Sequence, residues 1–217
     1  MFRDRADAGH QLAHYLKDRK FIDPLILAIP RGGIVIGDVL AKELSADLDV
    51  VLARKLRCPA QPELAVGALS EDGKVYLNEA VAEALQLSVD ELTEERELQL
   101  AEMARRRALF RSVRPQAPVA DRSIIVTDDG IATGSTMLAA LHWVRAQKPF
   151  EVIVANPVAS PDRLAPIREC CDEVLCLLQP QNFWAVGQYY YDFQPVSDEE
   201  VISILKRYAP DNAALHR

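Results

Sequence analysis

The sequence lacks a long hydrophobic run, a surplus of positive charge and a secretory leader. A membrane-spanning helix takes about 18 apolar residues in succession, whereas residues 25–29 are typical of the longest runs here. The first seven residues contain no apolar core of a signal peptide. With 25 Lys and Arg against 32 Asp and Glu, the net charge of −7 disfavours nonspecific binding to nucleic acid or anionic lipid. These absences predict a cytoplasmic protein that binds neither membrane nor nucleic acid.

Cysteine is also scarce, and its spacing suits neither a metal site nor a disulfide framework. Without a secretory context, we expect small free thiols, buried or half-buried, at Cys58, Cys170, Cys171 and Cys176. The chain is 49% hydrophobic and 26% charged, the profile of an ordinary globular protein. Its 217 residues suffice for one sizeable core. A soluble enzyme or binding protein is the starting expectation.

Short apolar, β-branched runs alternate with helical patterns along most of the chain. The lengths and composition of buried strands are found at residues 25–29, 48–52, 123–127, 151–155 and 173–178. Helices are expected between them at 34–44, 136–146 and 161–170, and near the ends at 6–19 and 198–208. This alternation predicts an α/β fold with a parallel sheet of about five strands flanked by helices.

The alternation is interrupted between Leu52 and Ser123. Asp72-Gly73, between β-prone runs at 64–69 and 74–77, predicts a hairpin. Residues 88–114 predict one long helix with acids in its first turns and arginines near its end. We expect a solvated helix end at Arg105, Arg106, Arg107 and Arg111, with a docking surface for an acidic partner as the alternative. The chain is therefore predicted to be one domain over 1–217 with an insertion over 58–115.

The stretch 123–136 joins an apolar strand, two acids, a loop of small residues and a helix. Asp128 and Asp129 end the strand, where open parallel sheets bind ligands. The loop that follows offers N–H groups and hydroxyls to a phosphate. Two carboxylates would repel a polyphosphate, but they suit sugar hydroxyls or Mg²⁺. A ribose phosphate is the predicted ligand; a Walker A loop is excluded because no lysine follows Gly134, and a Rossmann loop because G-x-G-x-x-G is missing.

The run from Val126 to Thr136 resembles the signature of the type I phosphoribosyltransferases, which bind phosphoribosyl pyrophosphate (PRPP). The order of elements resembles that family's core over about residues 20–180. The resemblance implies that Asp128 and Asp129 hold the ribose, with Mg²⁺ as cofactor and a homodimer as the assembly. It also implies a 5′-phosphate loop made by Gly130, Ala132, Thr133, Gly134, Ser135 and Thr136.

Two further segments match the family. Pro30-Arg31-Gly32-Gly33 ends the first strand, and its glycines allow close backbone approach while Arg31 adds a cation. In the family this loop, often with a strained peptide bond, receives the pyrophosphate. Arg54 and Lys55, with Arg57, follow the second strand and could neutralise the departing pyrophosphate; a solvated charge cluster is the alternative. We expect Arg54, Lys55 and Asp129 to be catalytic, and the hairpin after them to occupy the place of the family's flexible, water-excluding loop.

The segment 180–196 resembles the hood of the hypoxanthine-guanine members. Trp184 stands where those members carry the aromatic residue that stacks on the base, although hydrophobic packing is the alternative. Asp192 is a candidate metal ligand, but it lies five positions after Gly187 and not four as in those members. They also carry an acid where this chain has Ala132. Adenine-type members have alanine there, yet nothing else indicates adenine, so the acceptor stays open.

The predicted function is Mg²⁺-dependent transfer of phosphoribose from PRPP to a nitrogenous base or related nitrogen nucleophile, as in nucleotide salvage, with release of pyrophosphate. The alternative is a regulatory protein that senses PRPP or a nucleotide without turnover. A hydrolase is a third possibility. It is disfavoured because Arg54 and Lys55 suit a site that excludes water.

Overall fold

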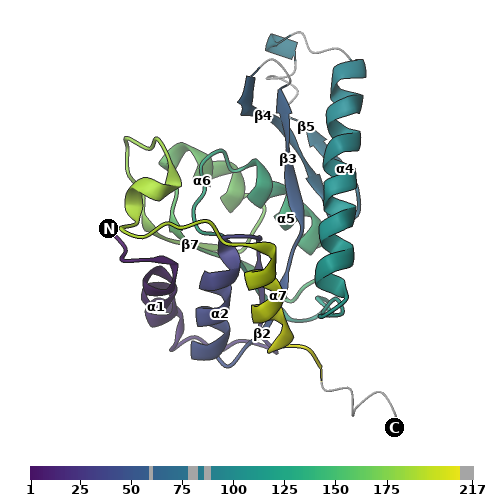
Figure 1. Cartoon of the computed structure of the whole chain (residues 1–217). Helices are drawn as coiled ribbons and strands as arrows, with labels where there is room; N and C mark the ends of the chain where they lie inside the picture. The colour runs from purple at the N-terminus through teal and green to yellow at the C-terminus, as the bar shows by residue number, and fades with distance from the viewer. Residues whose placement is uncertain (59–60, 78–82, 86–88, 211–217) are drawn as a thin grey trace.

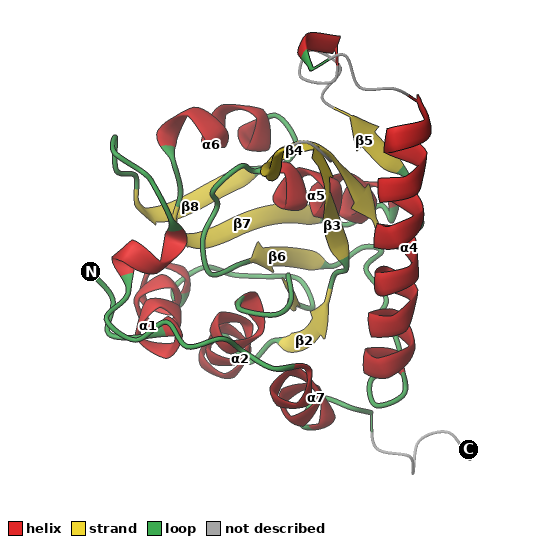
Figure 2. Cartoon of the chain, turned by 45° about the horizontal axis from the view of Figure 1, so that its top comes forward, coloured by secondary structure: helices red, strands yellow, loops and turns green. Residues whose placement is uncertain are grey.

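The main sheet contains five parallel strands in the order β2-β1-β6-β7-β8 (Figure 2). The computed structural model describes residues 1–58, 61–77, 83–85 and 89–210. The strands are β1 (Leu25–Ala28), β2 (Asp47–Val50), β6 (Ser123–Thr127), β7 (Glu151–Val158) and β8 (Glu173–Leu178). The predicted α/β fold with a five-stranded parallel sheet is confirmed.

Helices cover both faces of this sheet because successive strand residues point to opposite sides. Ile26 and Ala28 of β1 belong to a core shared with α1 (Arg5–Leu16), α2 (Gly33–Glu43) and α7 (Asp198–Lys206). Leu25 and Leu27 belong to a second core with α5 (Ser135–Ala146) and α6 (Pro161–Arg168). Figure 1 shows α1, α2 and α7 together on one side.

A second, antiparallel sheet contains β3 (Ala53–Cys58), β4 (Gln61–Ser70) and β5 (Val75–Leu77). Leu69 pairs with Val75 and Gly67 with Leu77, so the hairpin predicted around Asp72-Gly73 is confirmed. The strand β3 was not predicted, because the charges of Arg54, Lys55 and Arg57 mask its alternation. Leu56 and Cys58 are nevertheless buried, and pairing with β4 makes this segment a strand.

The long helix α4 (Val89–Arg111) stands beside β3 and reaches α7 (Figures 1 and 2). The expectation of a solvated helix end holds for Arg105 and Arg107, which are exposed, but not for Arg111. The Arg111 guanidinium lies 2.6 Å from Asp49 Oδ1 and 3.1 Å from Glu71 Oε1, and both acids are buried. Burial alone would lower the pKa of Arg111, but the two carboxylates outweigh it and raise that pKa. Arg105 pairs with Glu102 and with Asp198 of α7.

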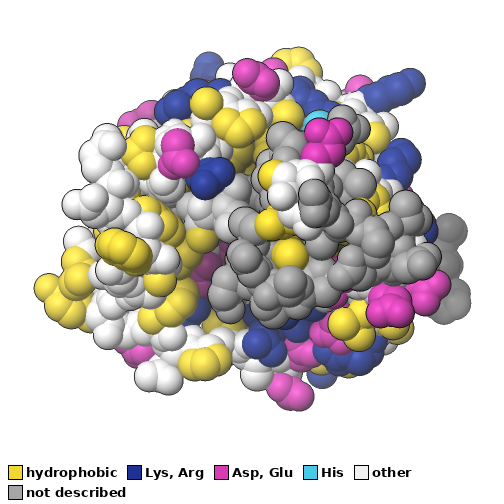
Figure 3. Space-filling model, turned by 90° about the horizontal axis from the view of Figure 1, so that it is seen from above, with side chains coloured by type: hydrophobic (Ala, Val, Ile, Leu, Met, Phe, Trp, Pro, Cys, Tyr) yellow, Lys and Arg dark blue, Asp and Glu magenta, His cyan; other side chains and the backbone are white. Residues whose placement is uncertain are grey.

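Charged side chains of both signs share the visible surface. Among the coloured side chains of Figure 3, basic and acidic groups are interspersed and not gathered by sign. None of the helices that the structure describes is both long and apolar enough to cross a membrane. Cys58 and Cys171 are buried and Cys170 and Cys176 half-buried, all as free thiols, as predicted.

Candidate active site

The strand order reverses between β1 and β6. From β1 the chain adds β2 on one side, and it then returns to place β6 on the other. Ala28 is paired with Thr127, so the carboxyl ends of these two strands lie next to each other. Ligands of open α/β sheets bind at such a switch point. The loop 29–33 leaves β1 there, and the loop 128–134 leaves β6.

The two loops touch, and glycine makes the contact possible. A Cβ atom at Gly32 would lie 1.8 Å from Asp129 Oδ2, and one at Gly33 would lie 2.9 Å from the Thr127 carbonyl oxygen. Both separations are too short for a side chain at either position. The peptide bond between Pro30 and Arg31 is cis. In this structure Gly32 therefore approaches the Asp129 carboxylate, and Gly33 approaches the backbone at the end of β6.

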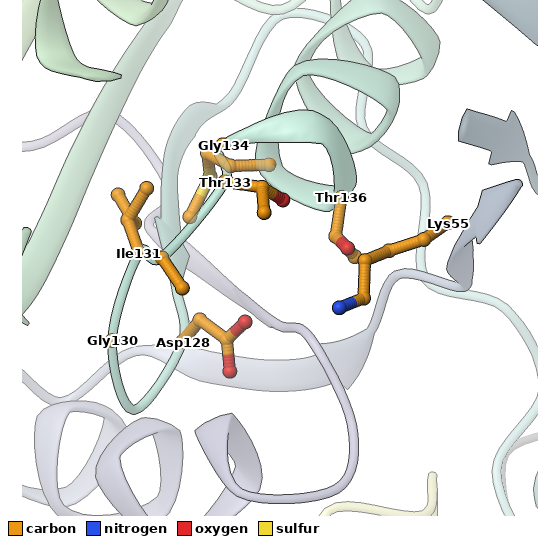
Figure 4. Close-up of a pocket in the computed structure, with 9 residues that line it drawn as sticks. Lys55, Asp128, Gly130, Ile131, Thr133, Gly134 and Thr136 are labelled. Carbon is orange, nitrogen blue, oxygen red and sulfur yellow. The ribbon is translucent and has the colours of Figure 1, made fainter. Parts of the chain in front are cut away.

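Two adjoining cavities open at this point. The first, of about 190 Å³, is lined by the loop after β6 and the start of α5, as Figure 4 shows; its lining residues are Lys55, Asp128, Gly130, Ile131, Ala132, Thr133, Gly134, Thr136 and Met137. The second, of about 180 Å³, is lined by Ile29, Pro30, Ala53, Arg54, Lys55, Arg57, Gln99, Asp128 and Thr136. Asp128, Lys55 and Thr136 border both. A ligand with two anionic groups could therefore occupy the pair.

The first cavity contains a helix N-terminus suited to an anion. Gly134 precedes α5 with φ of 79°, in the left-handed region that favours glycine, and no side chain caps the helix. The first N–H groups of an α-helix have no partner within the helix, and its dipole favours negative charge there. A phosphate is the natural partner for such a loop.

Asp128 is the acid that faces the cavities. Its carboxylate accepts a hydrogen bond from the Asp129 backbone N–H (2.8 Å), and its own N–H donates to Asn156 Oδ1 (2.9 Å). Within the described residues, no lysine or arginine forms an ion pair with it. Burial, and then the charge of Asp129, raise the pKa of Asp128 well above its usual range. In Figure 4 the amine of Lys55 and the carboxylate of Asp128 both point into the cavity.

Asp129 has a different environment and borders neither cavity. Arg5 Nε donates to its carboxylate (2.8 Å), and Arg5 Nη1 donates to the Gln194 carbonyl oxygen (2.8 Å). The guanidinium carbon lies 3.9 Å from the centre of the Phe193 ring, and the Tyr190 hydroxyl donates to the Asp129 carbonyl oxygen (2.6 Å). Burial raises the pKa of Asp129, although Arg5 acts in the opposite direction. The second acid thus connects the sheet to α1 and the segment after β8.

Comparison with known proteins identifies the family of this chain. The family model for the phosphoribosyl transferase domain matches residues 6–194. The chain belongs to this family. Proteins from two strains of Mycobacterium tuberculosis, provisionally named phosphoribosyl transferases, are each 42% identical over 207 residues. These matches cover 95% of this chain but 47% of the relatives, so the chain spans about half the length of the curated relatives it matches.

Solved structures agree on the fold. The crystal structure of TT1426 from Thermus thermophilus is 41% identical, with a TM-score of 0.82, and the match covers 96% of this chain and 99% of that one. AQ2163 from Aquifex aeolicus is 13% identical with a TM-score of 0.51, over 84% of this chain and 78% of that one, a likeness of fold alone.

Several residues predicted from the sequence do not lie at the two cavities of this phosphoribosyl transferase domain. Arg31 is exposed and borders neither. Trp184 is 84% exposed, and Asp192 lines a separate cavity with Asp4, Arg5 and Glu200. Ser135 begins α5 beside the phosphate loop without lining either cavity. The roles of these residues stay predictions.

Two residues at the site were missed by the sequence analysis. Arg5 is 124 positions from its partner Asp129, and Gln99 is 45 positions from its partner Arg54. Arg5 lies in the first turn of a helix, and no sequence pattern around it indicates a site. The same is true of Gln99, which lies within a highly charged helix. Only the fold brings Gln99 to the second cavity and Arg5 to Asp129.

Proposed function

We propose that this domain transfers the phosphoribosyl group of PRPP to a nitrogenous base or related nitrogen nucleophile, with release of pyrophosphate. One observation carries the proposal: two adjoining cavities at the switch point of the sheet share Asp128, Lys55 and Thr136. One offers a helix N-terminus and the other offers arginines. A ligand with a phosphate at one end and a pyrophosphate at the other matches both.

Some residues of the site would bind the substrate, and others would stabilise the charge of the leaving group. The loop 130–136 would hold the 5′-phosphate, and Asp128 would accept hydrogen bonds from the ribose hydroxyls. As the bond from the ribose carbon to pyrophosphate breaks, negative charge grows on the leaving group. Arg54 and Lys55 line the cavity where that charge would develop. Positioning and electrostatic stabilisation supply the catalysis, so no covalent nucleophile is needed.

Asp128 also fits a Mg²⁺ ion that arrives with the substrate. Mg²⁺ is usually bound through one or two carboxylates together with substrate phosphates, and Asp128 is a carboxylate without a cationic partner among the described residues. In that part of the chain, no group of three or more His, Cys, Asp or Glu is arranged to hold a metal ion. When bound, Mg²⁺ would neutralise charge on the pyrophosphate.

The acceptor is left open in this proposal. Ala132 lines the first cavity and brings no group that could handle a proton of the base. A place in nucleotide salvage and a homodimeric assembly are inferred from the family resemblance alone.

The direct test is pyrophosphate release from PRPP and Mg²⁺ against a panel of purine, pyrimidine and pyridine bases. The control variants are Asp128→Asn and Asp129→Asn. Release that depends on one base and disappears in Asp128→Asn would support the transfer and identify the acceptor. Release without any base would indicate hydrolysis. PRPP binding without release would favour the regulatory protein that senses its ligand.

A further inference from the structure

Arg54 is a half-buried cation that no acid neutralises directly. Within the described residues it forms no ion pair, and the nearest acids, Glu95 and Glu102, act on it only at longer range. Burial lowers the pKa of Arg54, and the neighbouring Arg106 guanidinium acts in the same direction. Such a cation at the wall of a cavity is suited to an anionic ligand.

The side chain that holds Arg54 is Gln99 of α4. Gln99 is 4% exposed, and its Oε1 accepts a hydrogen bond from Arg54 Nε (2.8 Å). Its Nε2 donates to Glu95 Oε1 (3.0 Å), which also accepts from the Arg57 backbone N–H (3.0 Å). A guanidinium can only donate and a carboxylate can only accept, so this amide has one possible orientation. The Glu95–Gln99–Arg54 chain is therefore fixed at both ends.

The amide fixes the guanidinium without cancelling its charge. A glutamate at this position would form an ion pair with Arg54, and the pair would attract an anion less. The amide occupies Nε alone, and among the described residues nothing accepts from the remaining N–H groups of the guanidinium, which can therefore donate to a ligand. The helix that carries Gln99 is itself anchored through Arg111 to Asp49 and through Arg105 to Asp198.

We propose that Gln99 is a positioning residue and that α4 serves to direct Arg54 at a pyrophosphate group in the second cavity. This inference rests on the proposed function, because pyrophosphate is the leaving group of that reaction. In this proposal the inserted helix α4 contributes to the site because its residue Gln99 positions Arg54.

The test compares Gln99→Glu and Gln99→Leu with Leu98→Glu as the matched charge control. Leu98 is the preceding residue of α4 and is 64% exposed. Binding of inorganic pyrophosphate and of ribose 5-phosphate, each with Mg²⁺, is measured by calorimetry at about pH 8, well above the ordinary pKa of a glutamate. We expect Gln99→Glu to weaken pyrophosphate binding by about 10-fold or more. Ribose 5-phosphate binding should stay close to that of Leu98→Glu. The melting temperature should fall below that of Leu98→Glu, because the new carboxylate would face Glu95 Oε1 in place of the N–H that now donates to it.

The order of the two Gln99 variants separates positioning from packing. If Gln99 only supported the structure, Gln99→Glu would weaken pyrophosphate and ribose 5-phosphate binding alike, because losing the hydrogen bond to Glu95 would disturb the whole site. If Gln99 keeps the charge of Arg54 available, Leu is the milder change for pyrophosphate affinity, while kcat falls in both variants. Pyrophosphate binding that is equal in wild type and Gln99→Glu, or weaker in Gln99→Leu than in Gln99→Glu, would overturn the inference. A wild-type domain that binds neither PRPP nor pyrophosphate would instead overturn the proposed function.

Discussion

At the scale of single residues, the site depends on two neighbouring acids with opposite surroundings. Asp129 is paired with Arg5, whereas Asp128 is half-buried beside the cavities without an ion-pair partner among the described residues. An acid whose pKa is raised by folding binds its proton more tightly in the folded state. Its contribution to stability is therefore present at low pH and lost as the pH rises through the raised pKa. Above that raised pKa, the charge of Asp128 works against folding and is available for a ligand.

We expect Asp128→Asn to stabilise the domain and to remove its affinity for PRPP. The amide can still accept from the Asp129 N–H but carries no buried charge, so the gain should be about 1 kcal/mol. For a domain of this size, that gain raises the melting temperature by about 2–4 °C. Scanning calorimetry at neutral pH checks the stability, with Asp18→Asn on the exposed surface as control. A lower melting temperature in Asp128→Asn would show that the carboxylate is satisfied in a way that the structure does not reveal.

Gly32 offers a second prediction at this scale, because its missing side chain leaves room for the Asp129 carboxylate. The added methyl group of Gly32→Ala must displace that carboxylate from Arg5, and we expect a loss of about 1–3 kcal/mol in the free energy of unfolding. In an Asp129→Ala background the same change should cost clearly less, since the obstructing atoms are gone. Urea unfolding of the four proteins measures the coupling. An equal loss of unfolding free energy in both backgrounds would mean that the added methyl group collides with atoms other than the Asp129 carboxylate.

At the scale of helices and strands, the sequence predicts the elements that are marked by a short, continuous pattern of residues. All residues of β1 and β6 are buried, and the short apolar runs Leu25–Ala28 and Ile124–Val126 predict these strands. In β3, by contrast, Arg54 and Lys55 resemble a charged loop, and only pairing with β4 reveals a strand. The acids, the glycine loops and the phosphate loop were predicted as candidates, since each lies within one short motif. Gln99 and Arg5 could not be, because nothing local distinguishes a hydrogen bond across 45 or 124 positions.

The helix α4 is attached to the rest of the molecule by the ion pairs of Arg111 near its C-terminal end. Arg111 is the cation between the buried carboxylates Asp49 and Glu71, and its removal would leave both without an ion-pair partner in the described part of the chain. Breaking a buried pair in this way costs about 3–5 kcal/mol. We therefore expect Arg111→Met to lower the free energy of unfolding by about that amount in urea. Arg107→Met, on the exposed face of the same helix, should change it by no more than about 0.5 kcal/mol. Similar losses in the two variants would mean that helix propensity, and not the buried network, holds α4.

At the scale of the whole molecule, the N-terminus and the segment after β8 close over the sheet together. The Phe2 N–H donates to the Tyr189 carbonyl oxygen (2.8 Å), and the Tyr191 N–H donates to the Phe2 carbonyl oxygen (2.9 Å). Figure 1 shows the N-terminus lying beside this segment. Arg5 adds the connection to the sheet itself, since it contacts Asp129, Gln194 and Phe193. Three parts of the chain that are distant in sequence thus meet at one guanidinium.

The Arg5 connection predicts a loss of stability that depends on pH. In Arg5→Met the Asp129 carboxylate keeps its burial and loses its cation, so its pKa should rise further. Because a raised pKa in an acid costs stability only where the acid is ionised, the destabilisation should be largest at alkaline pH and shrink as the pH falls and Asp129 binds a proton. Adding Asp129→Asn to Arg5→Met should remove this pH dependence and leave a smaller, constant loss from the missing contacts with Gln194 and Phe193. Melting temperatures of wild type, both single variants and the double variant across the pH range measure it. A loss in Arg5→Met that is the same at every pH would mean that Arg5 joins the molecule by packing and hydrogen bonding alone, and that Asp129 does not depend on it for its charge.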